Sequence, residues 1–329
     1  MAFTLEEYQN LDTDLIVKGL YHHIRKADQG FLNRLAVRPF AGNGMKYNVK
    51  TSRAAISDIL YNEDVPESSG DFEQRSAAIY IVAHDSLLYD VPKELNSTQD
   101  PWVVQLESDM DDFMHAVCTR MVRGQTSTLG NVKQAKGLLK LIAELESEAT
   151  VDLDGLNNSQ VVVNHATSGA LTLPKLDELI DAVDGCNALL MSKKTRRKVN
   201  ALARASGSVL TETHNDFGDF ILNYNAIPIH LDENIPDNMD DNDGSSVNAI
   251  ATWNPAQVIA ATHDNSPIFA LRVGDENGFC VMQAIPFTLE PPFRHQKKLA
   301  DVRRKKWFMG FGLFDKYAAA VLTGMNPGE

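Results

Sequence analysis

The residues that could do chemistry in this chain form a few small acidic or histidine-containing groups. The run from Asp240 to Gly244 has the composition of a calcium-binding loop. Placing its glycine at the turn position would make Met239 the first ligand and Ile250 the last, and neither side chain offers an oxygen. The run is therefore interpreted as a solvated acidic loop, with weak cation binding at its tip left open.

Two further groups contain histidine. His22 and His23 are adjacent in a segment with helical spacing, and adjacent side chains on a helix diverge, so one metal ion could hardly take both. A second group could imitate a carboxylate site on one helix, but no other motif converges on it, and it is interpreted as a solvated or intersubunit face: Asp109, Asp111, Asp112 and His115. We predict no bound metal and no cofactor.

Motifs that carry enzymatic chemistry are missing from the sequence. No glycine is followed by lysine, which removes a phosphate-binding P-loop, and neither HExxH nor GxSxG occurs. Cys118, Cys186 and Cys280 are odd in number and far apart, so neither a disulfide framework nor a CxxC metal knuckle is indicated. We predict that the chain is not an enzyme. A cytoplasmic α/β enzyme with an unfamiliar site remains the alternative from another class.

Composition and charge narrow the class of protein. The 329 residues are 43% hydrophobic and 23% charged, which is typical of a globular protein. No apolar run reaches the roughly 20 residues that a bilayer requires, and we expect no membrane contact. The formal charge of -13 argues against a protein that mainly coats nucleic acid, because neutralising phosphates requires a basic surface.

Basic residues gather in two places. Because no aromatic residues are interleaved with them, they do not indicate binding of single-stranded nucleic acid. They could pair with acidic segments such as residues 232–243, a turn-rich stretch that predicts an exposed loop. They could also contact another subunit, touch DNA or form ordinary surface, and the sequence leaves these options open. The residues are Lys193, Lys194, Arg196, Arg197 and Lys198 in the first cluster and Arg294, Lys297, Lys298, Arg303, Arg304, Lys305 and Lys306 in the second.

The first quarter of the chain predicts an arm and an extended loop. Thr4 and Glu7 have capping-box spacing before a helical pattern that ends near Gly30. Residues 37–40 and 45–49 flank a glycine-rich turn and predict a hairpin. Residues 51–75 have too few apolar residues for a core and predict a long projecting loop, a length that compact domains seldom tolerate without a partner.

The remaining elements alternate in type. Residues 77–82 predict a strand, and the longest helix is predicted between the cap Asp100 and Gly124, about 35 Å at 1.5 Å per residue. Short elements then predict a compact α/β domain. The expected elements are helix 173–183, strand 188–191, helix 192–205, and strands 221–231, 268–273, 279–285, 307–314 and 318–322.

This order of parts resembles the major capsid proteins of tailed bacteriophages, a fold shared with encapsulin shells. Local sequences strengthen the resemblance, above all Leu171-Thr172-Leu173-Pro174-Lys175 and Ala188-Leu189-Leu190-Met191-Ser192 with the residues that follow each. The resemblance implies an α+β fold with four parts: an N-terminal arm (1–30), an extended loop (31–78), a peripheral domain with a long spine helix (79–128 and 297–329), and an α/β axial domain (129–296).

The resemblance also implies a function. Such proteins assemble as hexamers and pentamers into an icosahedral shell around packaged double-stranded DNA, first as a procapsid that matures. The implied partners are further copies, a separate scaffolding protein, a portal protein, decoration proteins in some cases, and DNA through weak non-specific contact. The implied location is the virion capsid, assembled in the host cytoplasm. An encapsulin compartment, with protein cargo in place of a genome, is the alternative.

Contacts between subunits are predicted at residues of the arm, the extended loop, the spine helix and the basic clusters. Some members of the family form an isopeptide bond between an extended-loop lysine and an asparagine of a neighbouring subunit. Lys46, Lys50 and Asn326 lie in the corresponding regions. Position alone does not supply the chemistry of that bond, and we predict a non-covalent shell. The predicted contact residues are Leu5, Tyr8, Lys46, Tyr47, Lys50, Phe72, Asp109, Asp112, Arg196, Arg197, Arg303 and Arg304.

Overall fold

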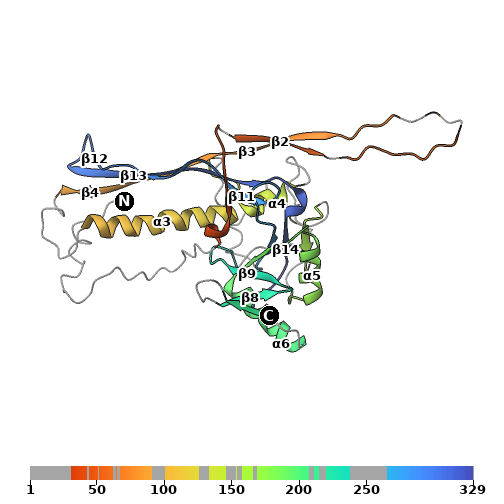
Figure 1. Ribbon diagram of the computed structural model, residues 1–329. Coiled ribbons are helices and arrows are strands. Elements are labelled where there is room, and N and C mark those ends of the chain that lie inside the picture. Colours follow the sequence, from red (N-terminus) through yellow and green to blue (C-terminus); the bar gives the residue numbers. More distant parts are fainter. Residues whose placement is uncertain are drawn as a thin grey trace.

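The computed structural model describes residues 31–328 with internal gaps (Figure 1). The predicted arm, with Leu5, Tyr8 and the pair His22-His23, lies outside the described residues, as does the acidic run 240–244. The gaps are residues 43, 51, 62–63, 65–66, 91–100, 126–132, 146–152, 154–157, 166–168, 207–210, 215–219 and 238–264.

A long five-stranded sheet forms one end of the molecule, and helix α3 (Pro101–Arg123) runs along it (Figure 1). Proline is favoured at the first position of a helix, where no backbone donor is needed, so the predicted start and length of α3 are confirmed. Its buried stripe includes Phe113, Val117 and Met121. The strands are β1 (Ala36–Pro39), β11 (Phe279–Leu289), β13 (Ala300–Leu313) and β12 (Phe293–Arg294) in spatial order, with β4 (Tyr80–Tyr89) also paired to β13.

A mixed seven-stranded sheet forms the α/β part. Its strands β6 (Ala188–Met191) and β10 (Ile268–Leu271) are buried at every position, as continuous apolar runs predict. Helices α4 (Leu138–Ala143), α5 (Leu173–Asp181) and α6 (Lys193–Ser206) belong to this half of the chain. The spatial order is β5 (Val161–Val163), β14 (Ala319–Thr323), β10, β6, β9 (Ile227–Leu231), β8 (Phe220–Tyr224) and β7 (Thr211–His214).

One hydrophobic core joins the two sheets. It runs from Val117 of α3 through Phe311 of β13 to Phe269 of β10 without interruption. Phe31, almost fully buried beside the short 3-10 helix Leu32–Arg34, closes it with its ring 5.6 Å from that of His230. Burial there, with Arg34 nearby, lowers the pKa of His230 to about 4.

The division into peripheral and axial domains remains a prediction, and one segment departs from it. Residues 297–329 were expected to stay with the spine helix. Strand β14, which follows the 3-10 helix Lys316–Ala318, instead lies between β5 and β10 of the seven-stranded sheet. All five of its residues are buried, so this position removes an apolar run from water.

The extended loop is a two-stranded hairpin that projects from the body (Figure 1). Strand β2 (Gly44–Lys50) pairs antiparallel with β3 (Phe72–Ala78), from Gly44 opposite Ala78 to Lys50 opposite Phe72. Residues 52–71 continue beyond the last pair, apart from the gaps. The expected projection is therefore found, and the loop is shorter than predicted because β3 begins at Phe72.

The strand expected over residues 77–82 is divided between the end of β3 and the start of β4. Two further strand predictions are wrong, each because of a turn. The hairpin expected from residues 37–40 and 45–49 does not form, since β1 pairs in parallel with β11 and β2 pairs with β3; Gly42, at φ 132°, adopts a conformation open mainly to glycine between them. The single strand expected over 221–231 is the hairpin β8–β9, whose turn holds Asn225 and Ala226 at positive φ.

The acidic segment after β9 is also not an exposed loop at its start. Asp232 has no exposed surface, and its Oδ1 accepts hydrogen bonds of 2.8 Å from both the backbone and the side-chain nitrogen of Asn234. Ile235 is buried in the core beside it. The prediction for residues 232–237 is therefore wrong, because these hydrogen bonds satisfy a carboxylate inside the protein.

Candidate functional site

Within the described part of the chain, no group of three or more His, Cys, Asp or Glu side chains could hold a metal ion. In the same part, no helix is both long and apolar enough to cross a bilayer. Cys118 and Cys280 are buried and Cys186 is half-buried, all without disulfides. The predicted contact residues lie on several elements of the described part of the chain.

Asp109 faces its own subunit. Lys305 of β13 has no exposed surface, and its Nζ lies 3.8 Å from Asp109 Oδ2 on α3 and 3.5 Å from the Leu106 carbonyl oxygen. Burial lowers the pKa of Lys305, while Asp109 and Asp112 raise it. The pair fixes α3 on the sheet. Asp112 is exposed, and the assignment of Asp109 and Asp112 to an intersubunit face stays a prediction.

Arg304 is likewise paired inside the subunit. Its Nε and Nη2 donate to the two carboxylate oxygens of Asp85 at 2.7 and 2.8 Å, and this hydrogen bonding holds the pKa of Asp85 below its usual value. The pair lies in a shallow open groove on the sheet with Ile81 and Phe308. Arg303, next along β13, is half-buried.

The basic start of α6 meets the acidic segment that follows β9, within one chain. Lys193 pairs with Glu233, and Lys194 Nζ lies 3.6 Å from Asp237 Oδ2. The pairing suggested by the sequence thus occurs, but it requires no neighbouring subunit. Arg196 is half-buried and Arg197 exposed on the same helix, and their contact with another subunit stays a prediction.

The hairpin tip carries apolar side chains that the described part of the subunit does not cover. Ile56 is 94% exposed, Leu60 74% and Tyr61 100%, and Ile59 is also exposed. Phe72, at the start of β3, is 69% exposed. Large apolar groups gathered in this way on a projection are typical of a protein interaction site. Apart from Phe72, sequence reasoning missed them, because apolar residues without periodicity do not stand out in a loop.

Polar contacts hold the two legs of the tip together. Ser52 Oγ donates to Asp71 Oδ2 at 3.1 Å and accepts from the Asp71 backbone nitrogen at 3.0 Å. Further out, the Ser68 hydroxyl donates to the Ala55 carbonyl oxygen. The two legs below the exposed apolar residues are therefore held to each other, which lowers the entropy cost of binding.

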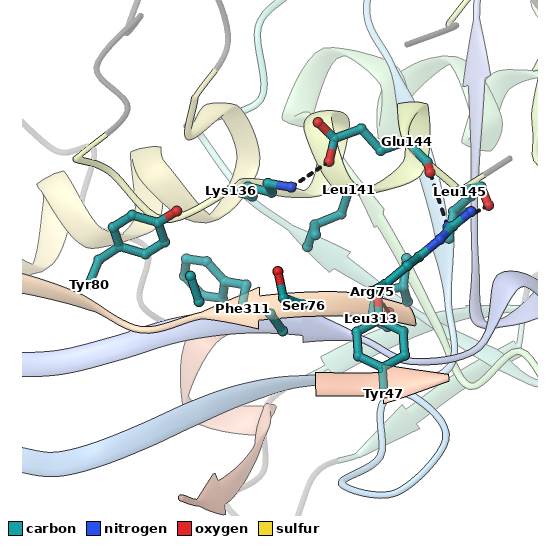
Figure 2. A pocket seen from close by; sticks show the side chains of 12 residues that line it. Tyr47, Arg75, Ser76, Tyr80, Lys136, Leu141, Glu144, Leu145, Phe311 and Leu313 are labelled. Atoms are coloured by element: carbon teal, nitrogen blue, oxygen red, sulfur yellow. Dashed lines mark hydrogen bonds and ion pairs between the residues drawn. The ribbon is translucent and has the colours of Figure 1, made fainter. Parts of the chain in front are cut away.

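The base of the hairpin is anchored on the body (Figure 2). Arg75 is 5% exposed and its Nη1 donates to the carbonyl oxygens of Glu144 and Leu145 at 3.2 and 2.8 Å. The Tyr47 ring packs edge-on against Phe314, 5.3 Å between centroids, and its hydroxyl donates to the Leu313 carbonyl at 3.3 Å. Tyr47 is thus an anchor within the subunit, and its assignment to an intersubunit contact stays a prediction.

Beside this anchor lies a cavity of about 30 Å³, lined by Tyr80, Lys136 and Leu141 as well as the anchor residues (Figure 2). Lys136 Nζ donates to Glu144 Oε2 at 2.8 Å on its wall. Ligand pockets usually measure about 300 Å³ or more, so this cavity has room for one or two waters and no substrate.

The residues considered for cross-linking do not meet within the subunit. Lys46 and Lys50 are exposed on β2. Asn326 is half-buried near the other sheet, and its Oδ1 accepts from the Gly328 nitrogen at 2.7 Å. A non-covalent shell stays a prediction.

Among known proteins, this chain matches solved structures but no family model and no curated sequence. Solved structures do match over nearly its whole length. The holo-SrpI encapsulin complex from Synechococcus elongatus PCC 7942 has a TM-score of 0.65 at 13% identity, covering 100% of this chain and 98% of that chain.

Two capsid structures match similarly. The cyanophage A-1(L) capsid has a TM-score of 0.65 at 12% identity, covering 98% of each chain. The capsid of the native GTA particle has a TM-score of 0.60 at 13% identity, covering 97% of each chain. The chain therefore has the α+β fold shared by tailed-phage capsid proteins and encapsulins, as the sequence resemblance implied.

Proposed function

We propose that this chain is the major subunit of an icosahedral capsid, assembling as hexamers and pentamers around packaged double-stranded DNA. The observation that carries the proposal is the projecting hairpin, whose apolar tip is exposed in the single subunit. The fold of the whole chain is shared with capsid proteins and with an encapsulin shell protein. The absence of a catalytic site stays a prediction.

Burial of the tip supplies the driving force for assembly. Covering one large apolar side chain contributes about 1.5 to 3 kcal/mol, and the tip exposes several. A specific interface of ordinary size buries about 1,600 Å² in total, and a subunit in a shell makes several such contacts. Many modest contacts per subunit then give a closed particle that dissociates slowly.

The cargo distinguishes this proposal from its alternative. Structural similarity does not separate them, since the encapsulin and the cyanophage capsid have the same TM-score of 0.65. The local likeness of residues 171–182 and 188–198 to phage proteins favours a genome over a protein cargo. A capsid role further implies a scaffolding protein, a portal, decoration proteins in some cases, weak DNA contact, and assembly in the host cytoplasm.

The test removes the tip and leaves its anchor. Replacing residues 53–69 with a short Gly-Ser linker keeps β2, β3 and the Ser52–Asp71 contact. We expect a folded subunit that forms no closed particles by electron microscopy, while wild type and the polar control Ser57→Ala form them. Normal particles from the deletion variant would refute the role given to the hairpin.

A further inference from the structure

We propose that the outer face of helix α6 binds the phosphates of double-stranded DNA. Three cations form this surface, called the α6 basic face: Arg197, Lys198 and Arg204. The inference rests on the proposed function, and it names the surface through which a subunit contacts the packaged genome.

Helix α6 has a charge opposite to that of the whole chain. Its 14 residues include six cations and no acidic residue, although the formal charge of the chain is -13. Helices α3 and α5, by contrast, both contain acidic residues. Like charges four residues apart destabilise a helix, and Lys193 with Arg197 and Lys194 with Lys198 are two such pairs. Folding of the single subunit therefore gives no reason for this concentration of positive charge.

The helix buries one side and exposes the other. Thr195, Val199 and Ala203 are buried, and Val199 belongs to the core of the α/β part. Arg197 and Arg204 are exposed, and residues seven positions apart lie on the same side of a helix. Figure 1 shows α6 at the margin of the α/β part, at the bottom of the view. The α6 basic face is therefore directed away from the core.

The acidic segment after β9 neutralises only the start of the helix. Its residues Glu233 and Asp237 pair with the first two lysines of α6. Within the described part of the chain, the three cations of the α6 basic face make no ion pair. Arg197 Nε donates to the Lys193 carbonyl oxygen at 3.4 Å, a contact that leaves its charge in place. These three charges are therefore available to an acidic partner.

The spacing of the face suits the backbone of a DNA strand. Arg197 and Arg204 are seven residues apart, which is about 10 Å at 1.5 Å per residue. One strand of a duplex carries a phosphate about every 3.4 Å along the axis, so about three phosphates lie within that distance. Three cations can therefore meet three successive phosphates.

Nucleic acid fits this face better than an acidic protein does. Ala201 and Ala205 are exposed among the cations, and α6, which is described over its whole length, exposes no large apolar side chain. Protein interfaces take most of their affinity from aromatic and other large anchors, whereas phosphate contacts require only charge. The face also has no aromatic residue on which a base could stack, which favours a duplex over a single strand.

The acidity of the remaining chain limits the strength of this contact without preventing it. Charges in water are screened beyond about 8 Å at physiological salt, so a phosphate at the α6 basic face interacts mainly with the nearby cations. We therefore expect binding that is weak, independent of sequence and strongly dependent on salt.

The test measures binding of a short double-stranded DNA fragment to free subunits over a range of salt concentrations. Arg197→Gln with Lys198→Gln and Arg204→Gln should weaken binding at low salt by about tenfold or more. The slope of log affinity against log salt should fall by about 2 to 3, because each phosphate contact contributes about 0.9. Fluorescence anisotropy gives the affinities, and circular dichroism checks folding.

Two matched variants isolate the α6 basic face. Arg197→Lys with Arg204→Lys keeps the charges and should keep the slope, since a phosphate contact depends on charge. Lys46→Gln with Lys297→Gln and Lys298→Gln removes the same total charge from other exposed positions. This control should bind DNA within about twofold of wild type, because charges away from the contact are screened.

The outcomes separate this inference from the proposed function. Unchanged affinity and slope in the glutamine variant of α6 overturn the inference, as does an equal loss in the control with other lysines replaced. If the α6 variant keeps DNA binding but loses binding of polyglutamate, the face serves an acidic protein and the inference is also overturned. All these variants should still form closed particles. Failure of the wild-type chain to form particles contradicts the proposed function and leaves the DNA measurement standing.

Discussion

The seven-stranded sheet and the projecting hairpin use apolar residues in opposite ways. In β6 and β10 every residue is buried by other parts of the same chain. In the hairpin, Ile56 and Tyr61 are almost completely exposed. The sheet is therefore explained by folding of one subunit, whereas the exposed hairpin tip is explained by the proposed assembly with other copies.

The hairpin survives without a core because its base is fixed. An isolated two-stranded hairpin is marginally stable in water. Here Arg75 and Tyr47 attach the base to the body, and the tip adds contacts only between its own legs. Substitutions at three depths, from the sheet to the tip, should therefore have steadily smaller effects on subunit stability.

The largest effect is expected in the sheet. Phe269→Ala in β10 removes a fully buried ring and should lower the free energy of unfolding by about 3 to 5 kcal/mol, because the lost contacts leave a cavity. Urea denaturation followed by circular dichroism measures the change. A loss below about 1.5 kcal/mol would show that the site collapses around the cavity and that the packing is less dense than described.

An intermediate effect is expected at the hairpin base. Tyr47→Ala should lower the free energy of unfolding by about 2 kcal/mol, since the ring contact with Phe314 and a hydrogen bond are lost. The matched variant Tyr47→Phe keeps the ring and should lose about 1 kcal/mol or less. Limited proteolysis should cut the hairpin faster in the alanine variant. Equal behaviour of both variants and wild type would contradict the anchor.

The smallest effect on stability is expected at the tip. Leu60→Ser should change the free energy of unfolding by no more than about 0.5 kcal/mol, because the side chain is exposed in the subunit. Particle yield by gel filtration should nevertheless fall. Destabilisation of the isolated subunit would show that the tip packs within the chain, and the contrast between sheet and hairpin would fail.

Much of the fold could be predicted from local patterns. Pro101 at a helix start and the apolar run of residues 188–191 indicate their elements directly, because capping and burial depend on nearby residues. Pairing between distant segments could not be predicted in this way. Strand β1 pairs with β11, which lies about three quarters of the chain length away, and β13 begins among basic residues that give no apolar alternation.

The candidate site was predicted in outline and missed in detail. The projecting loop was expected, since a long segment poor in core residues needs a partner. The contacts that Tyr47 and Asp109 make within the subunit were not predicted, because the sequence does not show their distant partners Phe314 and Lys305. The apolar side chains exposed at the tip were not predicted, since the exposure of a loop residue depends on the path of the loop backbone relative to the rest of the protein.

The concealed amine of Lys305 has a practical consequence. Reagents that acylate lysine need the side chain in water, and this one has no exposed surface while α3 lies on β13. Modification at this position can occur only during moments when the helix lifts from the strands. The rate at which Lys305 is labelled, measured by mass spectrometry, therefore reports how often helix α3 separates from β13. The same measurement can be made on free subunits and on any particles that form.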